Sequence, residues 1–345
     1  MNEKYELFQA EPCDSKNLKK IYDSISYDGL LDIQFLRGED PYASIAGEGI
    51  DSVIVAAKNL ESGETFGMGA CCVHEMYVDG ELKRAGYLNS LKIMPGYQRK
   101  TLLLPKAFAY MGKCLKGKTD LCFASVLLSA KEIQKMFEKK RKNMPHYAKQ
   151  CVYTSFLFAP QRADKSVQLE NISVSELMDF FEKRAAGFNL APAGPVRGVC
   201  DENCYAWKKD GKTVAVCALV DETGHKNYHV RCYRGIAKIM PYVPTPLFGY
   251  PKFPKKGKDI DAVCISMLMF DENLSIKERC AFVKSASAKA KGRGLVMVGL
   301  TDSDPSYNAM KKIKTVKISS YLYTVNWGED QMVNGRPIYA DVTLM

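Results

Sequence analysis

The spacing of apolar residues predicts a chain of short strands and amphipathic helices. Residues 52–59 and 65–76 are rich in Val, Ile and Ala, and the polar stretch 61–64 between them is typical of a turn, so together they predict a hairpin. Residues 120–128 and 262–270 are almost entirely apolar, as in strands that are buried on both faces. Residues 101–115 and 275–291 have the length and the polar boundaries of helices.

The same order of elements occurs twice along the chain. Each half predicts strand, helix, hairpin, strand, helix, strand, helix and strand, and the polar stretch 160–165 between the halves is typical of a linker. We therefore expect two domains of similar architecture, at residues 1–162 and 166–345. The Pro-, Gly- and Lys-rich stretch 240–258 predicts a long loop in the second domain.

Composition limits the class of protein. The chain has 345 residues, 46% of them hydrophobic and 26% charged, as in ordinary globular proteins. Its twelve cysteines are scattered, mostly in apolar runs, which is typical of buried thiols in a reducing compartment. No export signal or apolar run of membrane-spanning length is evident, so we expect a cytoplasmic protein without a membrane partner. The net charge of +10 suits a polyanionic ligand but does not require one.

Residues 87–104 carry the most informative pattern. An apolar strand ends at Pro95-Gly96, a short basic turn follows, and a helix begins after it. Backbone N–H groups at a helix N-terminus are suited to binding an anion such as a pyrophosphate.

The segment from Leu91 to Lys100, in this order of elements, resembles the GCN5-related N-acetyltransferase (GNAT) superfamily. Residues 8–18 are similar to the opening strand and helix of that family. The resemblance covers residues 5–160 best and implies an α/β (α+β) protein of two tandem GNAT-like domains, each with a mixed, mostly antiparallel sheet flanked by helices. It also implies binding of acetyl-CoA or another acyl-CoA. The corresponding positions here are Leu91, Ile93, Met94, Gln98, Arg99, Lys100, Thr101, Leu102 and Leu103.

The phosphate turn departs from the family pattern. Gln98 matches its first position, but Thr101 and Leu103 replace the small residues that let a backbone approach phosphate closely. Arg99 and Lys100 offer charge instead. In the second half the corresponding stretch begins Asp271-Glu272, whose charge disfavours an anion, so we expect that half to be a degenerate partner domain.

The family's acid position also differs. Phe137 occupies the place of the tyrosine that protonates the leaving thiolate, so the resemblance leaves Tyr147, Tyr153 and Ser129 as substitutes. The implied reaction is attack of an amine on a thioester in the gap between strands 88–94 and 121–128, with a strand N–H near Ile93 polarising the carbonyl. His74 and Glu75 are the bases that we expect, although a His beside a Glu at a strand end also suits an ordinary surface.

Three alternatives remain open. The missing glycines and the Phe at the acid position also suit a catalytically inactive GNAT-fold protein that binds a small molecule or peptide between its domains. The basic run 135–142 could contact nucleic acid, but it equally suits a solvated helix end. Cys200, Cys204, His225, His229 and Cys232 are too irregularly spaced for a typical zinc site, and we expect no metal. The favoured function is acyl-CoA-dependent N-acyl transfer to a small amine or peptide.

Overall fold

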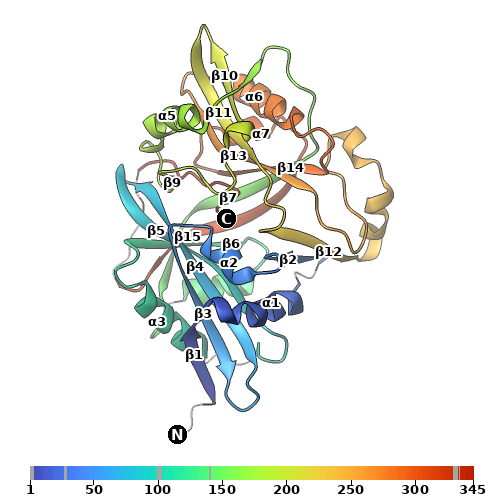
Figure 1. Ribbon diagram of the computed structural model, residues 1–345. Coiled ribbons are helices and arrows are strands. Elements are labelled where there is room, and N and C mark those ends of the chain that lie inside the picture. The colour runs from blue at the N-terminus through green and yellow to red at the C-terminus, as the bar shows by residue number, and fades with distance from the viewer. Residues whose placement is uncertain (1–3, 27–28, 99–102, 140, 329–332, 334) are drawn as a thin grey trace.

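The computed structural model describes residues 4–26, 29–98, 103–139, 141–328, 333 and 335–345 (Figure 1). The first half contains, in chain order, β1 (Tyr5–Gln9), η1 (Pro12–Asp14), α1 (Ser15–Ser24), β2 (Leu31–Leu36), α2 (Pro41–Ala46), β3 (Asp51–Asn59), β4 (Thr65–Val78), β5 (Glu81–Ile93), α3 (Leu103–Leu115), β6 (Leu121–Leu127), α4 (Lys131–Glu138) and β7 (His146–Phe158).

The second half repeats this order with additional short elements. It contains β8 (Leu169–Asn171), α5 (Val174–Ala185), β9 (Ala191–Pro192), η2 (Asp201–Asn203), β10 (Cys204–Lys209), β11 (Lys212–Val220), β12 (Asn227–Tyr233), η3 (Gly235–Tyr242), η4 (Thr245–Phe248), β13 (Ala262–Phe270), α6 (Ile276–Ala288), β14 (Leu295–Thr301), α7 (Tyr307–Met310) and β15 (Val316–Asn326).

The two halves share one mixed sheet. Its strand order is β1-β3-β4-β5-β6-β15-β7-β14-β13-β11-β10-β8, and β9 pairs with β4 outside this path. The pairs β5–β6 and β13–β14 are parallel, and the other pairs are antiparallel. This confirms the expected fold class of a mixed, mostly antiparallel sheet flanked by helices.

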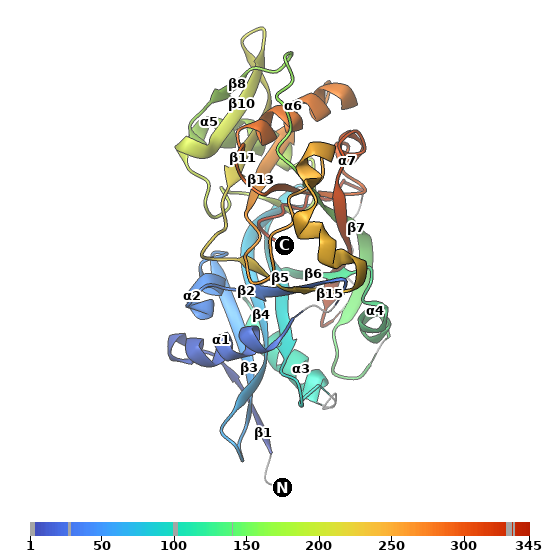
Figure 2. The same ribbon diagram turned by 90° about the vertical axis from the view of Figure 1, so that its right-hand side faces the viewer.

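The last strand of each half lies against the sheet of the other half. β15 lies between β6 and β7, where Leu322 is opposite Ser125 on one side and Cys151 on the other. β7 in turn pairs with β14, with Ser155 opposite Gly299. Figures 1 and 2 show the resulting continuous sheet, with the second half above the first. The strands β7 and β15 therefore connect the halves more closely than a flexible linker would.

Most of the predicted elements are present. The hairpin β3–β4 has its turn at 60–64, and β13 and β14 cover 262–270 and 295–301 as expected. Leu18, Ile21 and Tyr22 form the buried face of α1. The predicted start of the helix at Thr101 lies outside the described residues, and α3 is described from Leu103.

The sequence did not predict β2, α2 or the pairing of β12. β2 and β12 pair with each other in a separate two-stranded sheet, in which Phe35 is opposite Tyr228. The strands are far apart along the chain, so local patterning gives little signal of this pairing. The predicted loop 240–258 also contains short 3₁₀ helices, namely the end of η3 and all of η4.

Helices cover both faces of the sheet. In the first half, α1 and α2 pack on one face of β3 and β4, while α3 packs against β3 and β1. In the second half, α5 and α6 both contact β11 and β13. No helix in the described part of the chain is long and apolar enough to cross a membrane. All twelve cysteines are free thiols, and most are buried, although Cys13 and Cys200 are exposed.

Candidate functional site

A large cavity passes through the first half of the sheet and reaches the second half. Its volume is about 640 Å³, within the range of roughly 300–1,000 Å³ that is typical of ligand pockets. One part lies between the sheet and helices α3 and α4. Its lining is mostly apolar and includes Val55, Ala57, Gly67, Gly69, Leu104, Ala107, Phe108, Met111, Val126, Phe137 and Tyr147.

The other part of the cavity lies beneath the β2–β12 ribbon. Its lining comes from both halves and includes Ile33, Phe35, Arg37, Lys92, Lys226, Tyr228, Ile260, Met297, Val342 and Met345. This part is more polar because Arg37, Lys92 and Lys226 bring amine and guanidinium groups to it. The cavity thus has an apolar part and a cationic part.

The two parts meet where β5 and β6 separate. The parallel pairing of these strands runs from Ala85 opposite Leu121 to Leu88 opposite Ala124, and no pair follows. Beyond this point both strands continue, and residues of each line the cavity: Ser90 and Leu91 on β5, Ser125 and Leu127 on β6. The predicted gap between these strands is therefore present.

A β-bulge lies at the start of this gap, and the second half has the same bulge. The register of β4 and β5 shifts beyond the pair Ala70–Asn89, and the next residue, Ser90, has a φ of 55°. In the second half the pair is Ala218–Ser266, and the next residue, Met267, has a φ of 50°. Left-handed conformations are uncommon for residues other than glycine, so their recurrence at corresponding positions marks a shared backbone feature.

In the second half this bulge binds a carboxylate of the chain itself. The Met267 N–H donates to Asp341 Oδ2 at 2.7 Å, and the Ser266 hydroxyl donates to Asp341 Oδ1 at 2.8 Å. Asp341 is buried and also accepts from the Thr343 N–H and the Tyr339 hydroxyl. The N–H at this bulge is therefore directed at an anionic oxygen. In the first half the corresponding residue, Ser90, lines the cavity.

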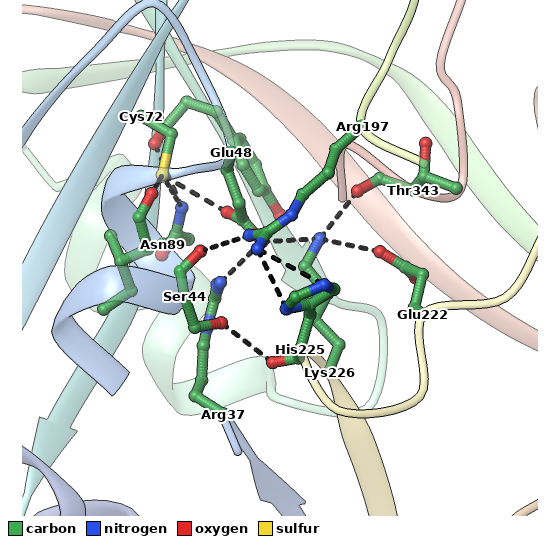
Figure 3. A network of polar contacts seen from close by, with 12 residues as sticks. Arg37, Ser44, Glu48, Cys72, Asn89, Arg197, Glu222, His225, Lys226 and Thr343 are labelled. Atoms are coloured by element: carbon green, nitrogen blue, oxygen red, sulfur yellow. Dashed lines mark hydrogen bonds and ion pairs between the residues drawn. The ribbon is translucent and has the colours of Figure 1, made fainter. Parts of the chain in front are cut away.

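Arg37 and Lys226, which line the cationic part of the cavity, belong to a buried network of charges (Figure 3). Glu48, which follows α2, accepts from Arg37 at 2.5 Å and pairs with Lys226 at 2.8 Å. Lys226 also donates to the Thr343 carbonyl at 2.6 Å and lies 3.5 Å from Glu222. Lys226 and Glu222 belong to the second half, so the network joins the halves.

The charges in this network shift one another's pKa values. Burial alone would raise the pKa of Glu48, but Lys226 and Arg37 outweigh it and lower that pKa to about 2. Burial raises the pKa of Glu222, helped by the nearby carboxylates of Glu48 and Asp341. Burial would lower the pKa of Lys226, but Glu222 and Glu48 outweigh it and raise that pKa, so the ammonium stays charged.

Lys92 is the cavity-lining amine whose pKa lies closest to neutrality. Its side chain is buried on β5, with the ammonium 4.9 Å from the ring centroid of Tyr22 and 5.9 Å from that of Phe35. Burial, reinforced by the positive charge of Arg37, lowers the pKa of Lys92 to about 8. A substantial fraction of this amine is therefore neutral slightly above neutral pH, and it can then accept a proton.

The architecture matches known solved structures, whereas no family model and no curated protein sequence matches the chain. Saccharomyces cerevisiae N-myristoyltransferase with bound myristoyl-CoA aligns with a TM-score of 0.62 at 10% identity, over 94% of this chain and 83% of that chain. A GCN5-related N-acetyltransferase from Anabaena variabilis aligns with a TM-score of 0.51 at 9% identity, over 92% of this chain and 72% of that chain. The chain has the GNAT fold. Similarity at such low identity establishes the fold alone.

Within this GNAT fold, the predicted cofactor-binding residues divide into three groups. Leu91, Ile93 and Leu103 line the cavity. Met94 packs against the cluster beneath α1, and Gln98 is exposed at the end of the described turn. Arg99, Lys100, Thr101 and Leu102 lie outside the described residues, so the predicted phosphate turn stays a prediction.

The three predicted catalytic residues do not lie together. Tyr147 lines the cavity, whereas His74 and Glu75 are not part of its lining. Glu75 is exposed on β4. His74 is buried beside the charge network, its Nε2 has no hydrogen-bond partner among the described atoms, and burial lowers its pKa to about 4. His74 is therefore an interior residue, and the surface interpretation is wrong for it, whereas the catalytic role of this pair stays a prediction.

Tyr147 lies directly against the residue that replaces the expected tyrosine. Its ring stacks on Phe137 with centroids 4.3 Å apart and an interplanar angle of 5°. Burial raises the pKa of Tyr147, so its hydroxyl keeps its proton at neutral pH. Tyr153, another candidate, also lines the cavity, where its hydroxyl accepts from Ser155 at 3.0 Å.

Sequence reasoning missed Ser90, Lys92 and Asp341. Lys92 lies between the apolar residues Leu91 and Ile93, and in a strand this alternation predicts that the polar residue is exposed. The bulge at Ser90 shifts the alternation of side chains along β5, and Lys92 is buried instead. The contact of Asp341 with Met267 joins residues distant in the chain, so no local pattern could show it.

Several residues of the alternative zinc and nucleic-acid sites contact other side chains of the protein. His225 contacts Arg197 at 2.9 Å, His229 contacts Asp259 at 2.7 Å, and Cys200 is exposed. In the described part of the chain no group of three or more His, Cys, Asp or Glu side chains could hold a metal ion. In the basic run, Lys135 pairs with Glu132 at 2.9 Å.

Proposed function

We propose that this protein is an acyl-CoA-dependent N-acyltransferase whose reaction takes place in the first half, at the gap between β5 and β6. The observation that carries the proposal is the paired bulge. In the second half the N–H at the bulge, on Met267, donates to the Asp341 carboxylate at 2.7 Å, and in the first half the corresponding residue, Ser90, lines a ligand-sized cavity. Solved structures with the same fold include an N-myristoyltransferase with bound myristoyl-CoA.

The N–H at the bulge stabilises the negative charge that develops during the reaction. As the amine nitrogen attacks the thioester carbon, negative charge develops on the carbonyl oxygen, and a fixed N–H stabilises it. The second half supports Ser90 as this donor, because the N–H of Met267 already holds a carboxylate oxygen there. The sequence predicted a donor near Ile93, and Ser90 lies three residues before that position.

Proton transfer falls to Lys92 and Tyr147. The amine must lose a proton for the amide to form, and neutral Lys92 takes it, directly or through water. When the tetrahedral intermediate collapses, the C–S bond breaks and Tyr147 protonates the leaving thiolate. The products are the N-acylated acceptor and CoA with a free thiol.

The apolar part of the cavity favours an acyl chain longer than acetyl. Ala57, Gly67, Gly69 and Ala107 leave space between the sheet and α3, and an acetyl group would occupy little of it. We therefore extend the expectation of acetyl-CoA to a long-chain acyl-CoA. The cationic part, beneath the β2–β12 ribbon, would receive the small amine or peptide acceptor.

The decisive experiment is calorimetric titration with CoA, acetyl-CoA and myristoyl-CoA, followed by an amine screen that detects released thiol. Myristoyl-CoA is expected to bind most tightly. Gly69→Leu fills the apolar part, because a Cβ at Gly69 would lie 3.9 Å from Leu91 and 4.0 Å from Met111. This variant should weaken myristoyl-CoA by about tenfold or more and leave CoA unchanged. If none of the three compounds binds, the proposal is wrong.

A non-catalytic binding protein is the second candidate. No Asp, Glu or His side chain is among the described residues that line the cavity, which is unusual for an enzyme that must deprotonate an amine. Tyr147→Phe and Lys92→Gln distinguish the candidates. In a transferase they lower turnover while the affinity for acyl-CoA stays the same, and in a binding protein there is no turnover to lower.

A further inference from the structure

The segment between β12 and β13 exposes an unusual number of large apolar side chains. Ile236, Ile239 and Tyr242 on η3 are 82%, 63% and 77% exposed. Leu247 and Phe248 on η4 are 82% and 58% exposed. We call these five residues the apolar patch. Contiguous exposed apolar surface on a folded protein marks an interaction site.

The secondary structure aligns part of this patch into one stripe. A 3₁₀ helix has three residues per turn, so side chains three positions apart lie above one another. Ile236, Ile239 and Tyr242 have this spacing on η3. Figure 1 shows the segment in gold at the right-hand edge of the molecule, and in Figure 2 it faces the viewer. The stripe is therefore an outward-facing ridge rather than the wall of a pocket.

The same segment is strongly basic. Between Arg234 and Lys258 the sequence has six Lys and Arg residues and no Asp or Glu. Arg234 pairs with Asp32 at 3.2 Å. Lys238, Lys252, Lys255 and Lys256 are exposed, and none of them forms an ion pair with another described residue. The apolar patch is thus accompanied by a surplus of positive charge.

We infer that this segment docks the protein on an anionic lipid bilayer. Apolar side chains that project from a short helix enter the boundary between headgroups and acyl chains, and lysines beside them are attracted to anionic headgroups. A protein partner would have to combine an apolar surface with a concentration of acidic groups. A bilayer that contains an acidic lipid offers both everywhere on its surface. The inference revises the expectation of no membrane partner and does not depend on the proposed reaction.

Vesicle co-sedimentation of the full chain tests this inference. We expect binding to phosphatidylcholine vesicles that contain phosphatidylserine, and much weaker binding to phosphatidylcholine alone. The triple variant Ile236→Ser/Leu247→Ser/Phe248→Ser should lose about a hundredfold in the partition coefficient. For Lys252→Gln/Lys255→Gln/Lys256→Gln the partition coefficient should fall by a similar factor, and the binding that remains should depend less on the salt concentration.

A matched control variant tests whether the loss of vesicle binding is specific to the apolar patch. Leu60, in the β3–β4 turn, and Leu82, on β5, are 51% and 55% exposed and lie outside this segment, so Leu60→Ser/Leu82→Ser should bind like the wild type. Circular dichroism checks that each variant is folded. The inference is overturned if the full chain does not prefer the acidic vesicles or if the patch variants bind them as well as the wild type. It is also overturned if sedimentation shows a dimer that only the patch variants dissociate, because the patch would then join two copies of the chain.

Discussion

His74 shows how a single buried group ties stability to pH. Its imidazole lies within the first half near Glu48 and Lys226, and burial lowers its pKa to about 4 from an ordinary value near 6.5. Glu48 opposes this shift and Lys226 adds to it, but neither outweighs the loss of solvent. The folded protein therefore keeps His74 neutral at pH values at which the unfolded chain protonates it.

This difference predicts a loss of stability in mild acid. Between pH 6.5 and pH 4 the unfolded chain binds the extra proton, so the free energy of unfolding falls as the pH falls. His74 alone should account for a loss of about 2 kcal/mol between pH 7 and pH 5. His74→Leu should abolish that part of the loss, as measured by urea unfolding at the two pH values. His146→Leu, which changes a half-buried histidine on β7, is the control, and equal pH dependence of the wild type and His74→Leu would contradict the assignment.

At the scale of elements, the pairing of β7 with β14 depends on a glycine. Gly299 on β14 lies opposite Ser155, and the ring of Tyr153 from β7 covers it. A Cβ at Gly299 would lie 2.7 Å from Cε2 of that ring. Tyr153 is buried and lines the cavity, so its ring has little freedom to move away. The glycine therefore sets how closely the two strands and the cavity wall approach.

Gly299→Ala is accordingly expected to destabilise the fold. Overpacking of a buried site costs about 1–3 kcal/mol, which chemical denaturation resolves. Gly194→Ala serves as the control, because a Cβ at Gly194 meets no described atom within 4 Å. Unchanged stability of Gly299→Ala would mean that the ring of Tyr153 can leave the strand.

At the scale of the whole molecule, the charge network joins the halves. Glu48 from the first half compensates both Arg37 and Lys226, and the side chains of all three are at least nine-tenths buried. Removal of one member of a buried ion pair leaves an uncompensated charge, which is more costly than the loss of an exposed pair.

Glu48→Gln should therefore lower the free energy of unfolding by about 3–5 kcal/mol. The double variant Glu48→Gln/Arg37→Met should recover part of that loss, because Arg37 is the cation that Glu48→Gln orphans, whereas Lys226 keeps Glu222 as a partner. Glu61→Gln, which removes the exposed partner of Lys4, should leave the denaturation midpoint unchanged. An equal effect of Glu48→Gln and Glu61→Gln would show that water reaches the network.

The exchanged strands predict one cooperative unit in place of two independent domains. Residues 1–162 alone would lack β15, so β6 and β7 would lose their shared neighbour and expose unpaired edges. We expect this fragment to aggregate, and the full chain to unfold in a single transition. Tryptophan fluorescence, which reports on Trp207 and Trp327 of the second half, should coincide with far-ultraviolet circular dichroism. A folded, monomeric fragment or two separate transitions would instead support the domain boundaries expected from the sequence.

The sequence by itself determined the elements whose patterns are local. Apolar runs gave β6, β13 and β14, turn residues gave the β3–β4 hairpin, and the repeated order gave the tandem fold class. It also supplied Leu91, Ile93, Leu103 and Tyr147 as residues of the cavity.

Only the tertiary structure decided the features made by contacts between distant parts of the chain. These are the exchange of β7 and β15, the β2–β12 ribbon, the burial of His74 and Lys92, and the binding of Asp341 by the second bulge. Hydrophobic spacing reports which face of an element is buried, but not which distant element covers it. Because the pKa values of His74, Lys92 and Glu48 depend on that covering, the chemistry of the site became apparent only with the fold.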